Sequence, residues 1–497
     1  MSMAEEGHAE KHKLDRAFVG GVAWTAGAKW LSQLVSWPSV LITARLLSPD
    51  DYGLMEMAGV YFIVTNVMAE FGIGMAVLQM RELDMAVTAQ LNTMAVISGI
   101  VAFLVSVGMA PLIADFFSAP ALNRLVIVAS LSFILTSLEA IPLGLLQRKM
   151  DYRRLSIAES AQAVITAVVS VGCAYAGLGY WSLLVGNLVG RTGNIALARY
   201  WCPVPFAMPH WEQISKPLRF GMEIAAQRVA GSINLLSDIF VIGRVLGPGP
   251  LGAYRFATNL ASAPAEKTGS LVMRVTGPLF SRVQNDKELM RRYFLIFTET
   301  LSMAVFPLVF GMATVAPEAV ERLLGPKWEA AAAPLRWLAV YMAIRSMGYL
   351  VSQLLTTLRL TRFGMWMSLA NFAVMPIGFY IASKWGLGMV AATWLFLSPL
   401  TFLPMAVKVL RAIHCSFLQY LTALLPALLG SASMIVAIEA LRHWVTLAGW
   451  PGLGTEVATG GLAYAAVLWG FYRRRLLTFY RFFMDLRKSP DAAVMAQ

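Results

Sequence analysis

The sequence predicts an all-α integral membrane protein with about 14 transmembrane helices, arranged as two parallel six-helix lobes followed by two C-terminal helices. Three observations support this prediction: an apolar composition, apolar runs of membrane-spanning length, and an internal repeat. Of 497 residues, 58% are hydrophobic and 14% are charged, whereas soluble proteins carry about 25% charged residues. With a mean hydropathy of +0.64, the chain has more apolar surface than one water-soluble core can bury.

Fourteen apolar runs are long enough to cross the hydrocarbon layer, which takes about 20 residues per helix. They lie at 20–44, 54–79, 91–117, 124–146, 156–176, 179–199, 219–244, 252–280, 293–316, 335–358, 364–383, 387–408, 417–441 and 455–473. The run at 252–280 is the least certain of these by hydropathy, because it contains Glu266, Lys267 and Arg274. The first 18 residues are polar and precede no cleavage site, so we expect the first run to be retained as an anchor.

The basic residues predict the orientation of the chain, since Lys and Arg accumulate in cytoplasmic loops. With the N-terminus inside, 25 of the 40 Lys and Arg residues fall on the cytoplasmic side and nine on the opposite side. We therefore expect both termini to be cytoplasmic and the number of spans to be even. The formal charge of +12 does not indicate nucleic-acid binding, because the basic residues sit between apolar runs and do not form a solvated face.

Two stretches of the chain repeat at an offset of 199 residues, RLLSPDDYGLMEMA at 45–58 and RVLGPGPLGAYRFA at 244–257. The matching pairs are Arg45 and Arg244, Leu47 and Leu246, Pro49 and Pro248, Gly53 and Gly252, and Ala58 and Ala257. Later landmarks keep the same order: Arg148 aligns with Arg359, and Gly177 with Gly386. Each copy follows the first span of a six-span set, so both halves enter the membrane in the same direction and are related by an axis along the membrane normal.

This repeat predicts the domain organisation. The expected parts are a cytoplasmic N-terminal segment at 1–18, an N-lobe at 19–200, a cytoplasmic linker at 201–217, a C-lobe at 218–412, two further helices at 413–473 and a basic cytoplasmic tail at 474–497. The arginines at 473–475 are expected to hold the tail against the anionic inner leaflet.

The stretch from Ala44 to Gly53, ARLLSPDDYG, resembles the signature of the polysaccharide exporters in the multidrug/oligosaccharidyl-lipid/polysaccharide flippase superfamily. Similar features are the aromatic and basic residues Trp24, Lys29 and Trp30, the segment Glu70-Phe71-Gly72, and the run Leu145-Leu146-Gln147-Arg148 with Tyr152. The resemblance extends over essentially the whole chain and is strongest to the Wzx/WzxC-type branch.

The resemblance implies two lobes in a V and the flipping of undecaprenyl-pyrophosphate-linked oligosaccharide repeat units across the bacterial inner membrane by alternating access. Such units serve exopolysaccharide, capsule or lipopolysaccharide biosynthesis. The expected partners are this lipid-linked oligosaccharide, membrane lipids, and a polysaccharide polymerase and co-polymerase; no nucleic-acid partner is expected.

Five basic residues inside predicted spans are candidates for binding the pyrophosphate, because charges inside a membrane usually face a cavity or a partner. Arginine bonds phosphate oxygens in pairs, and lysine adds a point charge. The candidates are Lys29, Arg228, Lys267, Arg274 and Arg345. The alternative is that they neutralise nearby acids, such as Glu223 near Arg228 and Glu266 beside Lys267. A further in-span base, Arg191, is expected to extend toward the cytoplasmic face.

Glu70, Asp238 and Glu266 are candidates for coupling to an H⁺ or Na⁺ gradient, and fixed salt bridges or helix-end placement are the alternative. The membrane potential acting on the anionic headgroup is a further source of drive. Pro264 is the candidate hinge. We expect no cofactor and no metal, and the scattered Cys173, Cys202 and Cys415 are expected to be small apolar filler.

Other functions fit the sequence less well than a flippase. The chain has no Walker A sequence and no catalytic residues are assigned, so it is predicted to be a transporter and not an enzyme. A membrane glycan polymerase or ligase would carry a sizeable periplasmic loop, whereas the outward loops here are short. A multidrug or cation antiporter of the same superfamily would have a net acidic and aromatic cavity. A purely structural scaffold is the remaining alternative.

Overall fold

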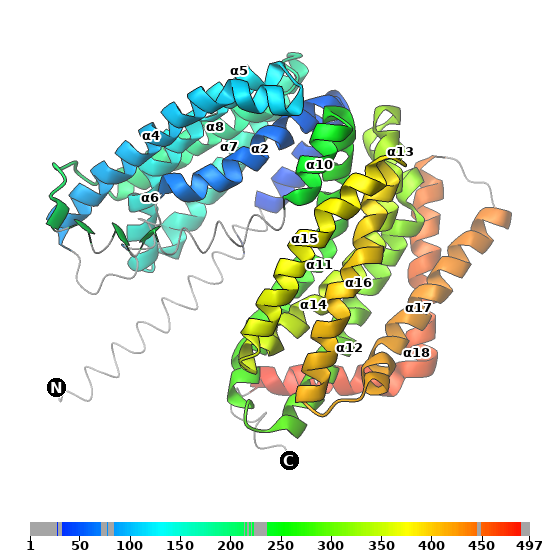
Figure 1. The fold of residues 1–497 in the computed structure, drawn as a ribbon. Helices are drawn as coiled ribbons and strands as arrows, with labels where there is room; N and C mark the ends of the chain where they lie inside the picture. The colour runs from blue at the N-terminus through cyan, green and yellow to red at the C-terminus, as the bar shows by residue number, and fades with distance from the viewer. Residues whose placement is uncertain are drawn as a thin grey trace, which may run out of the picture. The chain divides into compact units, whose positions relative to one another are not determined.

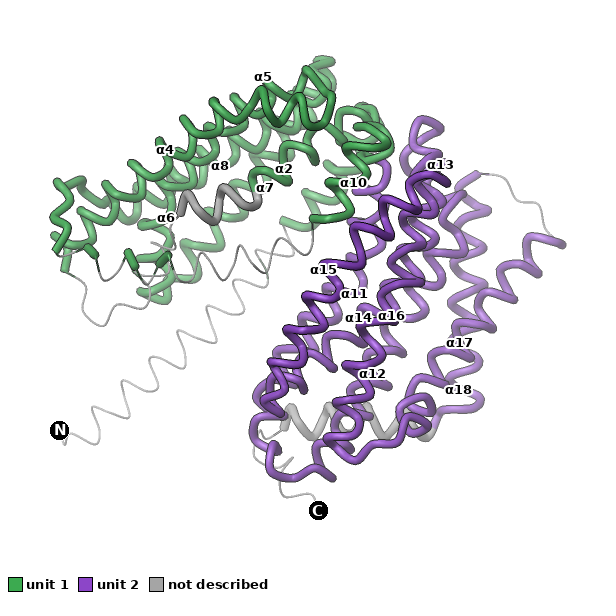
Figure 2. The backbone as a smooth tube through the Cα atoms, viewed as in Figure 1, with its two compact units in different colours: residues 1–252 green, residues 253–497 purple. Residues whose placement is uncertain are grey.

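Long apolar runs fold as helices because, in hydrocarbon, every backbone N–H and C=O must be bonded within its own segment. The computed structural model describes residues 32–70, 84–212, 236–444 and 449–488, with Gly27, Val77 and six further residues between 214 and 222. The side chains of helix residues 63–70 and 474–488 lie outside this description. The chain divides into two compact units, residues 1–252 and 253–497 (Figure 2). Both are helical, which confirms the all-α fold class.

Among the described residues, unit 1 contains a helix over 32–46 and seven further helices (Figure 1). These are α2 (Pro49–Glu70), α4 (Met85–Phe117), α5 (Ala121–Ala129), α6 (Leu131–Arg148), α7 (Tyr152–Tyr175), α8 (Trp181–Trp201) and α10 (Ser237–Val245). The predicted span at 124–146 is divided into α5 and α6 at Ser130, whose hydroxyl bonds the carbonyl of Ile127.

Unit 2 contains most of α11 and the eight elements that follow it (Figure 1). The elements are α11 (Pro248–Arg282), α12 (Lys287–Thr314), α13 (Ala316–Leu324), the 3₁₀ helix η1 (Pro326–Ala331), α14 (Ala332–Thr357), α15 (Thr361–Ser383), α16 (Leu387–Ala412), α17 (Phe417–Trp444) and α18 (Trp450–Lys488). The charged run at 252–280 thus forms one continuous 35-residue helix. Helix α18 is kinked at Tyr472 and continues through the predicted tail to Lys488.

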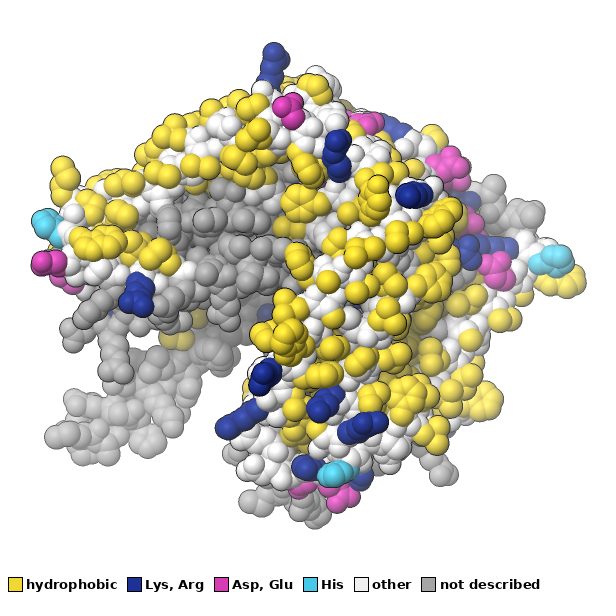
Figure 3. All heavy atoms as spheres, viewed as in Figure 1, with side chains coloured by type: hydrophobic (Ala, Val, Ile, Leu, Met, Phe, Trp, Pro, Cys, Tyr) yellow, Lys and Arg dark blue, Asp and Glu magenta, His cyan; other side chains and the backbone are white. Residues whose placement is uncertain are grey.

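The described residues contain eight helices that are long and apolar enough to cross a membrane. On the face formed by α15 and α16, large apolar side chains are open to the surroundings (Figure 3); Trp366, Ile377 and Leu400 are 56–62% exposed. Such a surface requires lipid around it, so the protein is a multi-pass membrane protein. The count of fourteen spans stays a prediction, because parts of the first, second and seventh spans lie outside the described residues.

The two copies of the repeated motif pack against each other within unit 1. A Cβ atom on Gly53 would overlap the carbonyl oxygen of Pro248, and a Cβ atom on Gly252 would overlap the carbonyl oxygen of Pro49. The contact is reciprocal, as expected for equivalent residues related by a two-fold axis. Both copies also begin a helix at the equivalent proline, α2 at Pro49 and α11 at Pro248. The repeated glycines therefore allow two helix starts to touch backbone to backbone.

This contact and α10 explain where the units divide. Phe240 of α10 stacks on Phe117 at the end of α4, with ring centroids 6.3 Å apart, and Arg244 Nη1 donates to Ser118 Oγ over 2.8 Å. Residues 237–252 therefore pack with unit 1, although the repeat assigns them to the predicted C-lobe. The predicted lobe boundaries remain a prediction.

Asp51, in the motif that carries the family resemblance, joins two pieces of chain. Its Oδ2 accepts from the Ser48 N–H at 2.9 Å and the Ser48 hydroxyl at 2.7 Å, and its Oδ1 accepts from the Tyr180 N–H at 2.9 Å. Tyr180 follows the repeated Gly177-Leu178-Gly179 segment, so two landmarks of the first half are bonded together. In the second copy the equivalent position is Pro250, which has no carboxylate.

The second half contains an insertion that the first half lacks. Only residues 118–120 separate α4 from α5, whereas residues 315–331 separate α12 from α14 and fold as α13 and η1. The shift of the repeat offset from 199 at Gly53 to 211 at Arg148 reflects this insertion. The six-helix bundle of the first half is built without such a segment, so α13 and η1 are additions to the common architecture.

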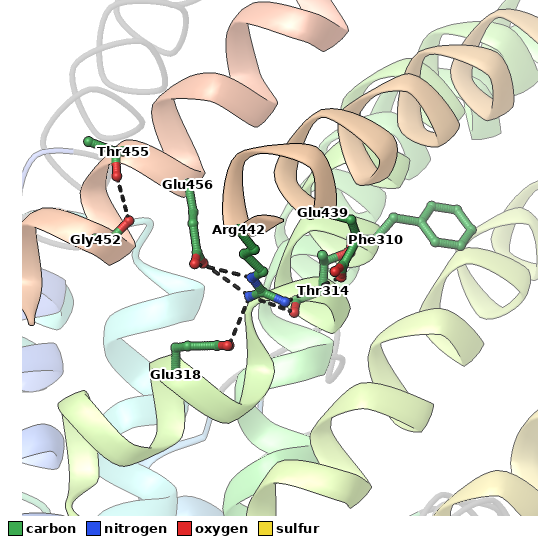
Figure 4. Close-up of polar contacts among 8 residues, drawn as sticks. All are labelled: Phe310, Thr314, Glu318, Glu439, Arg442, Gly452, Thr455 and Glu456. Carbon is green, nitrogen blue, oxygen red and sulfur yellow. Dashed lines mark hydrogen bonds and ion pairs between the residues drawn. The ribbon is translucent and has the colours of Figure 1, made fainter. Parts of the chain in front are cut away.

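Arg442, near the end of α17, joins the C-terminal helix pair to the rest of unit 2 (Figure 4). Its guanidinium lies 3.0 Å from Glu318 of α13, 3.3 Å from Glu439 and 3.1 Å from Glu456 of α18, and it donates to the carbonyl of Thr314. Tyr464 of α18 also donates to the carbonyl of Met303 in α12 over 2.8 Å. One arginine thus bonds groups from α12, α13, α17 and α18.

Replacing either crossing glycine by alanine is expected to destabilise the protein, because a methyl group must displace backbone, which has little room to move. We expect Gly53→Ala and Gly252→Ala each to cost about 1–3 kcal/mol or more, measured as a fall in unfolding temperature of the detergent-purified protein. The matched control is Gly59→Ala on the same helix, where nothing lies within 4 Å of the added Cβ and alanine favours the helix. Equal unfolding temperatures for Gly53→Ala and Gly59→Ala would contradict the packing described above.

Replacing Arg442 by methionine is expected to destabilise unit 2 by about 1–3 kcal/mol, less than for fully buried pairs because the side chains remain partly exposed. The cost arises because three carboxylates lose a shared partner. The triple variant Arg442→Met/Glu318→Gln/Glu456→Gln should recover part of the loss, since it removes the uncompensated charge as well. The series comprises the wild type, Arg442→Met, Glu318→Gln/Glu456→Gln and the triple variant. Thermal unfolding of these four proteins measures the coupling between Arg442 and the two glutamates, and purely additive effects on stability would contradict it.

Candidate functional site

Two of the five predicted cationic residues, Lys29 and Arg228, lie outside the described residues, as does the side chain of Glu70. The other three, Lys267, Arg274 and Arg345, are in unit 2. The site can therefore be built only from the helices of that unit.

Helix α11 has buried, mostly small residues on one side and exposed polar residues on the other. Ala261, Ala265 and Phe280 are fully buried, and the glycine at 269 lets the ring of Tyr349 from α14 pack directly on the helix. On the other side, Glu266, Lys267, Ser270 and Arg274 are exposed. At 3.6 residues per turn these four positions fall within an arc of about 100°, so they form one continuous polar face.

The third cation, Arg345, joins this face from α14. Its Nη2 atom lies 3.4 Å from Oε1 of Glu266, and the two side chains are 33% and 52% exposed. The acid-neutralising alternative therefore applies to Arg345, although the partner is Glu266 of another helix and the pair remains open to the surroundings. Among the described residues, no hydrogen bond or ion pair is found for Arg274. We name Glu266, Lys267, Arg274 and Arg345 the cationic face; its net charge is +2.

The other candidates are placed differently. Asp238 is 4% exposed in the first turn of α10 and accepts from the Ile239 N–H at 2.9 Å, which matches the helix-end alternative. Pro264 is half-buried inside the continuous helix α11, two residues before Glu266. Its role as a hinge stays a prediction.

Arg191, which is expected to extend toward the cytoplasmic face, has partners in a neighbouring helix. Its guanidinium lies between α8 and α6, 3.8 Å from Glu139 and bonded to Thr136. The two charged side chains are 22% and 12% exposed. An acid in a neighbouring helix keeps the arginine inside because a buried charge is strongly stabilised by an opposite charge.

Sequence reasoning missed an aromatic stripe that continues the cationic face along α14. Trp337, Tyr341, Arg345 and Tyr349 follow one another at intervals of four residues and are all partly exposed. The interval of four was a readable signal of a shared helix face, obscured by the apolar residues around it. Trp394 of α16 stacks on Tyr341 with ring centroids 5.2 Å apart and donates to the Tyr254 hydroxyl at 2.8 Å.

None of the three cysteines belongs to the cationic face. All three cysteines are free; Cys202 and Cys415 are buried. Burial raises the pKa of the Cys415 thiol, in the turn after α16, and so keeps it protonated. In the part of the chain that the structure describes, no group of three His, Cys, Asp or Glu side chains is placed to hold a metal ion.

Comparison with known proteins shows which family the chain belongs to. The family described as polysaccharide biosynthesis protein matches residues 42–333, more than half of the chain. The chain belongs to the polysaccharide biosynthesis protein family. This confirms the resemblance found in the motif that ends at Gly53.

Curated relatives of this polysaccharide biosynthesis protein include the lipopolysaccharide biosynthesis protein WzxC of Escherichia coli strain K12. It is 24% identical over 352 residues, which are 68% of this chain and 69% of the relative. The succinoglycan biosynthesis transport protein ExoT of Rhizobium meliloti strain 1021 is 27% identical over 62% of both chains. The teichuronic acid biosynthesis protein TuaB of Bacillus subtilis strain 168 is 22% identical over 67% of this chain and 69% of the relative.

Two solved structures show the same fold. The lipid II flippase MurJ, in an inward closed conformation, matches with a TM-score of 0.72 and 13% identity over 91% of this chain and 99% of that chain. An inward-facing multidrug resistance MATE transporter of the MOP superfamily matches with a TM-score of 0.58 and 14% identity over 77% of this chain and 95% of that chain. The chain therefore has the same fold as these two proteins.

The cationic face is expected to bind pyrophosphate. Inorganic pyrophosphate should raise the unfolding temperature of the purified protein, because it binds the folded state alone. The double variant Lys267→Gln/Arg274→Gln should weaken the apparent affinity roughly tenfold or more, since charged hydrogen bonds contribute about 1.5–3 kcal/mol each. Arg362→Gln, an exposed arginine at the start of α15, is the matched control. An equal loss in the control would assign the effect to overall charge.

Proposed function

We propose that this protein translocates oligosaccharides linked to undecaprenyl pyrophosphate from the cytoplasmic to the periplasmic leaflet of the bacterial inner membrane. The single observation that carries the proposal is the cationic face on a helix of membrane-spanning length, in a chain of the polysaccharide biosynthesis family. The names of its relatives, which concern lipopolysaccharide, succinoglycan and teichuronic acid synthesis, support a glycan precursor as cargo.

The chemistry of the face fits the headgroup of such a carrier. Arg274 and Arg345 offer planar forks that bond phosphate oxygens in pairs, and Lys267 adds an ammonium. Glu266 lies 3.4 Å from Arg345, so a pyrophosphate that binds Arg345 competes with Glu266 for the same guanidinium. On this proposal, Glu266 keeps the face from binding anions too tightly to release them.

The direction of transport follows from charge. Exposed arginines and lysines mark one end of unit 2, at the α14–α15 turn and the end of α16 (Figure 3); they include Arg359, Arg362, Lys408 and Arg411. By the positive-inside tendency this end is assigned to the cytoplasm, together with both termini. Outward movement of negative charge down the membrane potential yields roughly 2.3 kcal/mol per charge per 100 mV.

An ion gradient is a second source of drive in this proposal. Of the three acidic candidates, Glu266 contacts a substrate-binding arginine and so is best placed to couple protonation to release. No ATP-binding motif is present in the sequence, and transport of this kind requires none. A polymerase and a co-polymerase are proposed as the partners that receive the exported unit.

The competing functions predict different faces. A multidrug or cation antiporter needs an acidic lining, whereas the face here has a net charge of +2. A glycan polymerase or ligase needs catalytic side chains on an extracellular loop.

Deleting the gene in the bacterium that carries it should abolish surface polysaccharide and accumulate the lipid-linked repeat unit in the inner leaflet. Complementation by the wild type should restore export, and Lys267→Gln/Arg274→Gln should reduce it at least tenfold at equal protein level. Extraction of lipid-linked intermediates and accessibility to an externally added glycosidase measure both effects. If polymer length changes while the unit still reaches the periplasm, the polymerase function is supported instead.

A further inference from the structure

A pocket of about 860 Å³ lies where α13, η1 and the first turns of α14 meet in unit 2. Pro317 and Glu321 of α13, Pro326 and Glu329 of η1, and Arg336 and Trp337 of α14 line it. Its volume falls in the range of small-molecule sites, and it combines flat apolar surfaces with a few polar groups, as such sites do. None of these residues belongs to the cationic face.

The walls of the pocket are held from behind. Trp328 of η1 is fully buried, with its ring centroid 5.0 Å from that of Phe256. Helix α13 buries Ala316, Val320 and Leu324, which turns Pro317 and Glu321 outward. Behind α13, Glu318 bonds Arg442 at 3.0 Å (Figure 4). The pocket is therefore preformed, which lowers the entropic cost of binding a ligand.

The pocket is built by the insertion that only the second half contains. At the repeat offset of 211, Arg336 and Trp337 align with Leu125 and Val126 of the first half, which are both fully buried. The same offset aligns Tyr341, Arg345 and Tyr349 with Ser130, Ile134 and Leu138. The bundle thus folds with apolar or small residues at these positions. Tyr341 and Tyr349 pack against Trp394 and Gly269, whereas Arg336 and Trp337 line the pocket at positions that the first half fills with buried apolar residues.

The stripe on α14 leads from the pocket to the cationic face. Trp337 and Arg345 are eight residues apart on one helix, a rise of about 12 Å, with Tyr341 between them. A ligand whose phosphate lies at Arg345 would therefore place an attached short oligosaccharide near the pocket. Tyr341 and Tyr349 are packed on Trp394 and on α11 at Gly269, so Trp337 is the ring of this stripe that lines the pocket and offers an apolar face to a sugar ring.

We propose that this pocket binds neutral sugar residues of the oligosaccharide, separately from the pyrophosphate. The identity of the natural ligand rests on the proposed function. Glu321 and Glu329 accept hydrogen bonds from hydroxyls, Arg336 donates them, and Trp337 with the two prolines supplies apolar faces. A second phosphate or a uronate would meet two carboxylates against one arginine, and a lipid tail would leave all three charges without partners.

The test measures sugar binding and pyrophosphate binding on the same full-length protein in nanodiscs. The sugar probe is the neutral repeat oligosaccharide obtained by partial hydrolysis of the host strain's surface polysaccharide. Its binding is measured by isothermal titration calorimetry. Saturable binding is expected, at least tenfold weaker for Trp337→Ala and for Glu321→Gln/Glu329→Gln. Inorganic pyrophosphate should stabilise these variants as it does the wild type.

Two further variants keep the test decisive. Ala333→Trp fills the pocket from an exposed lining position and should block the sugar while leaving every charge in place. Trp366→Ala removes an exposed tryptophan from α15 and should change nothing. Absence of saturable sugar binding by the wild type, unchanged binding by all pocket variants, or equal losses of sugar and pyrophosphate binding would overturn the proposal. Normal sugar binding without accumulation of a lipid-linked unit in the deletion strain would overturn the proposed function alone.

Discussion

Charged side chains on a membrane-length helix must be kept out of hydrocarbon, and this constraint organises unit 2. Each such charge costs a few kcal/mol near the bilayer centre unless it meets water or a partner. Helix α11 satisfies the constraint by burying its small residues against α14 and leaving its charges on one face, with Arg345 bonded across to Glu266. The same small residues, Gly269 above all, bring α14 close enough to add its own polar stripe. Packing and charge placement are thus two results of one pattern along α11.

Hydropathy predicted the helices well because backbone bonding in lipid leaves few choices. Where the predicted spans are fully described, a helix or helix pair covers each of them to within a few residues, except that α18 continues well past the predicted end at 473. Even the charged run at 252–280 is one helix. Sequence reasoning missed two features: the break between α5 and α6 at Ser130, and the short helices α13 and η1 of the insertion. A hydropathy average over 20 residues does not resolve features this short.

The candidate site was predictable in residue type but not in pairing. Lys267 and Arg274 are exposed on one helix face, as their spacing indicates. The partners of Arg345 and Arg191 lie on other helices, 79 and 52 positions away, so only the packed structure identifies them. The family motif also proved to be structural where it is described. Gly53 and Asp51 arrange backbone at helix starts and turns, and the cationic face lies elsewhere in the sequence.

The bonding of Arg442 has a consequence for the length of the chain. Helices α17 and α18 lie outside the repeat, yet Arg442 of α17 bonds Glu318 of α13, the helix that carries the pocket residues Pro317 and Glu321. A gene truncated after α16 would therefore encode a protein whose insertion lacks this support, even though both repeat halves were intact. Helices α17 and α18 therefore support the insertion formed by α13 and η1, and they could be lost only if that insertion also changed.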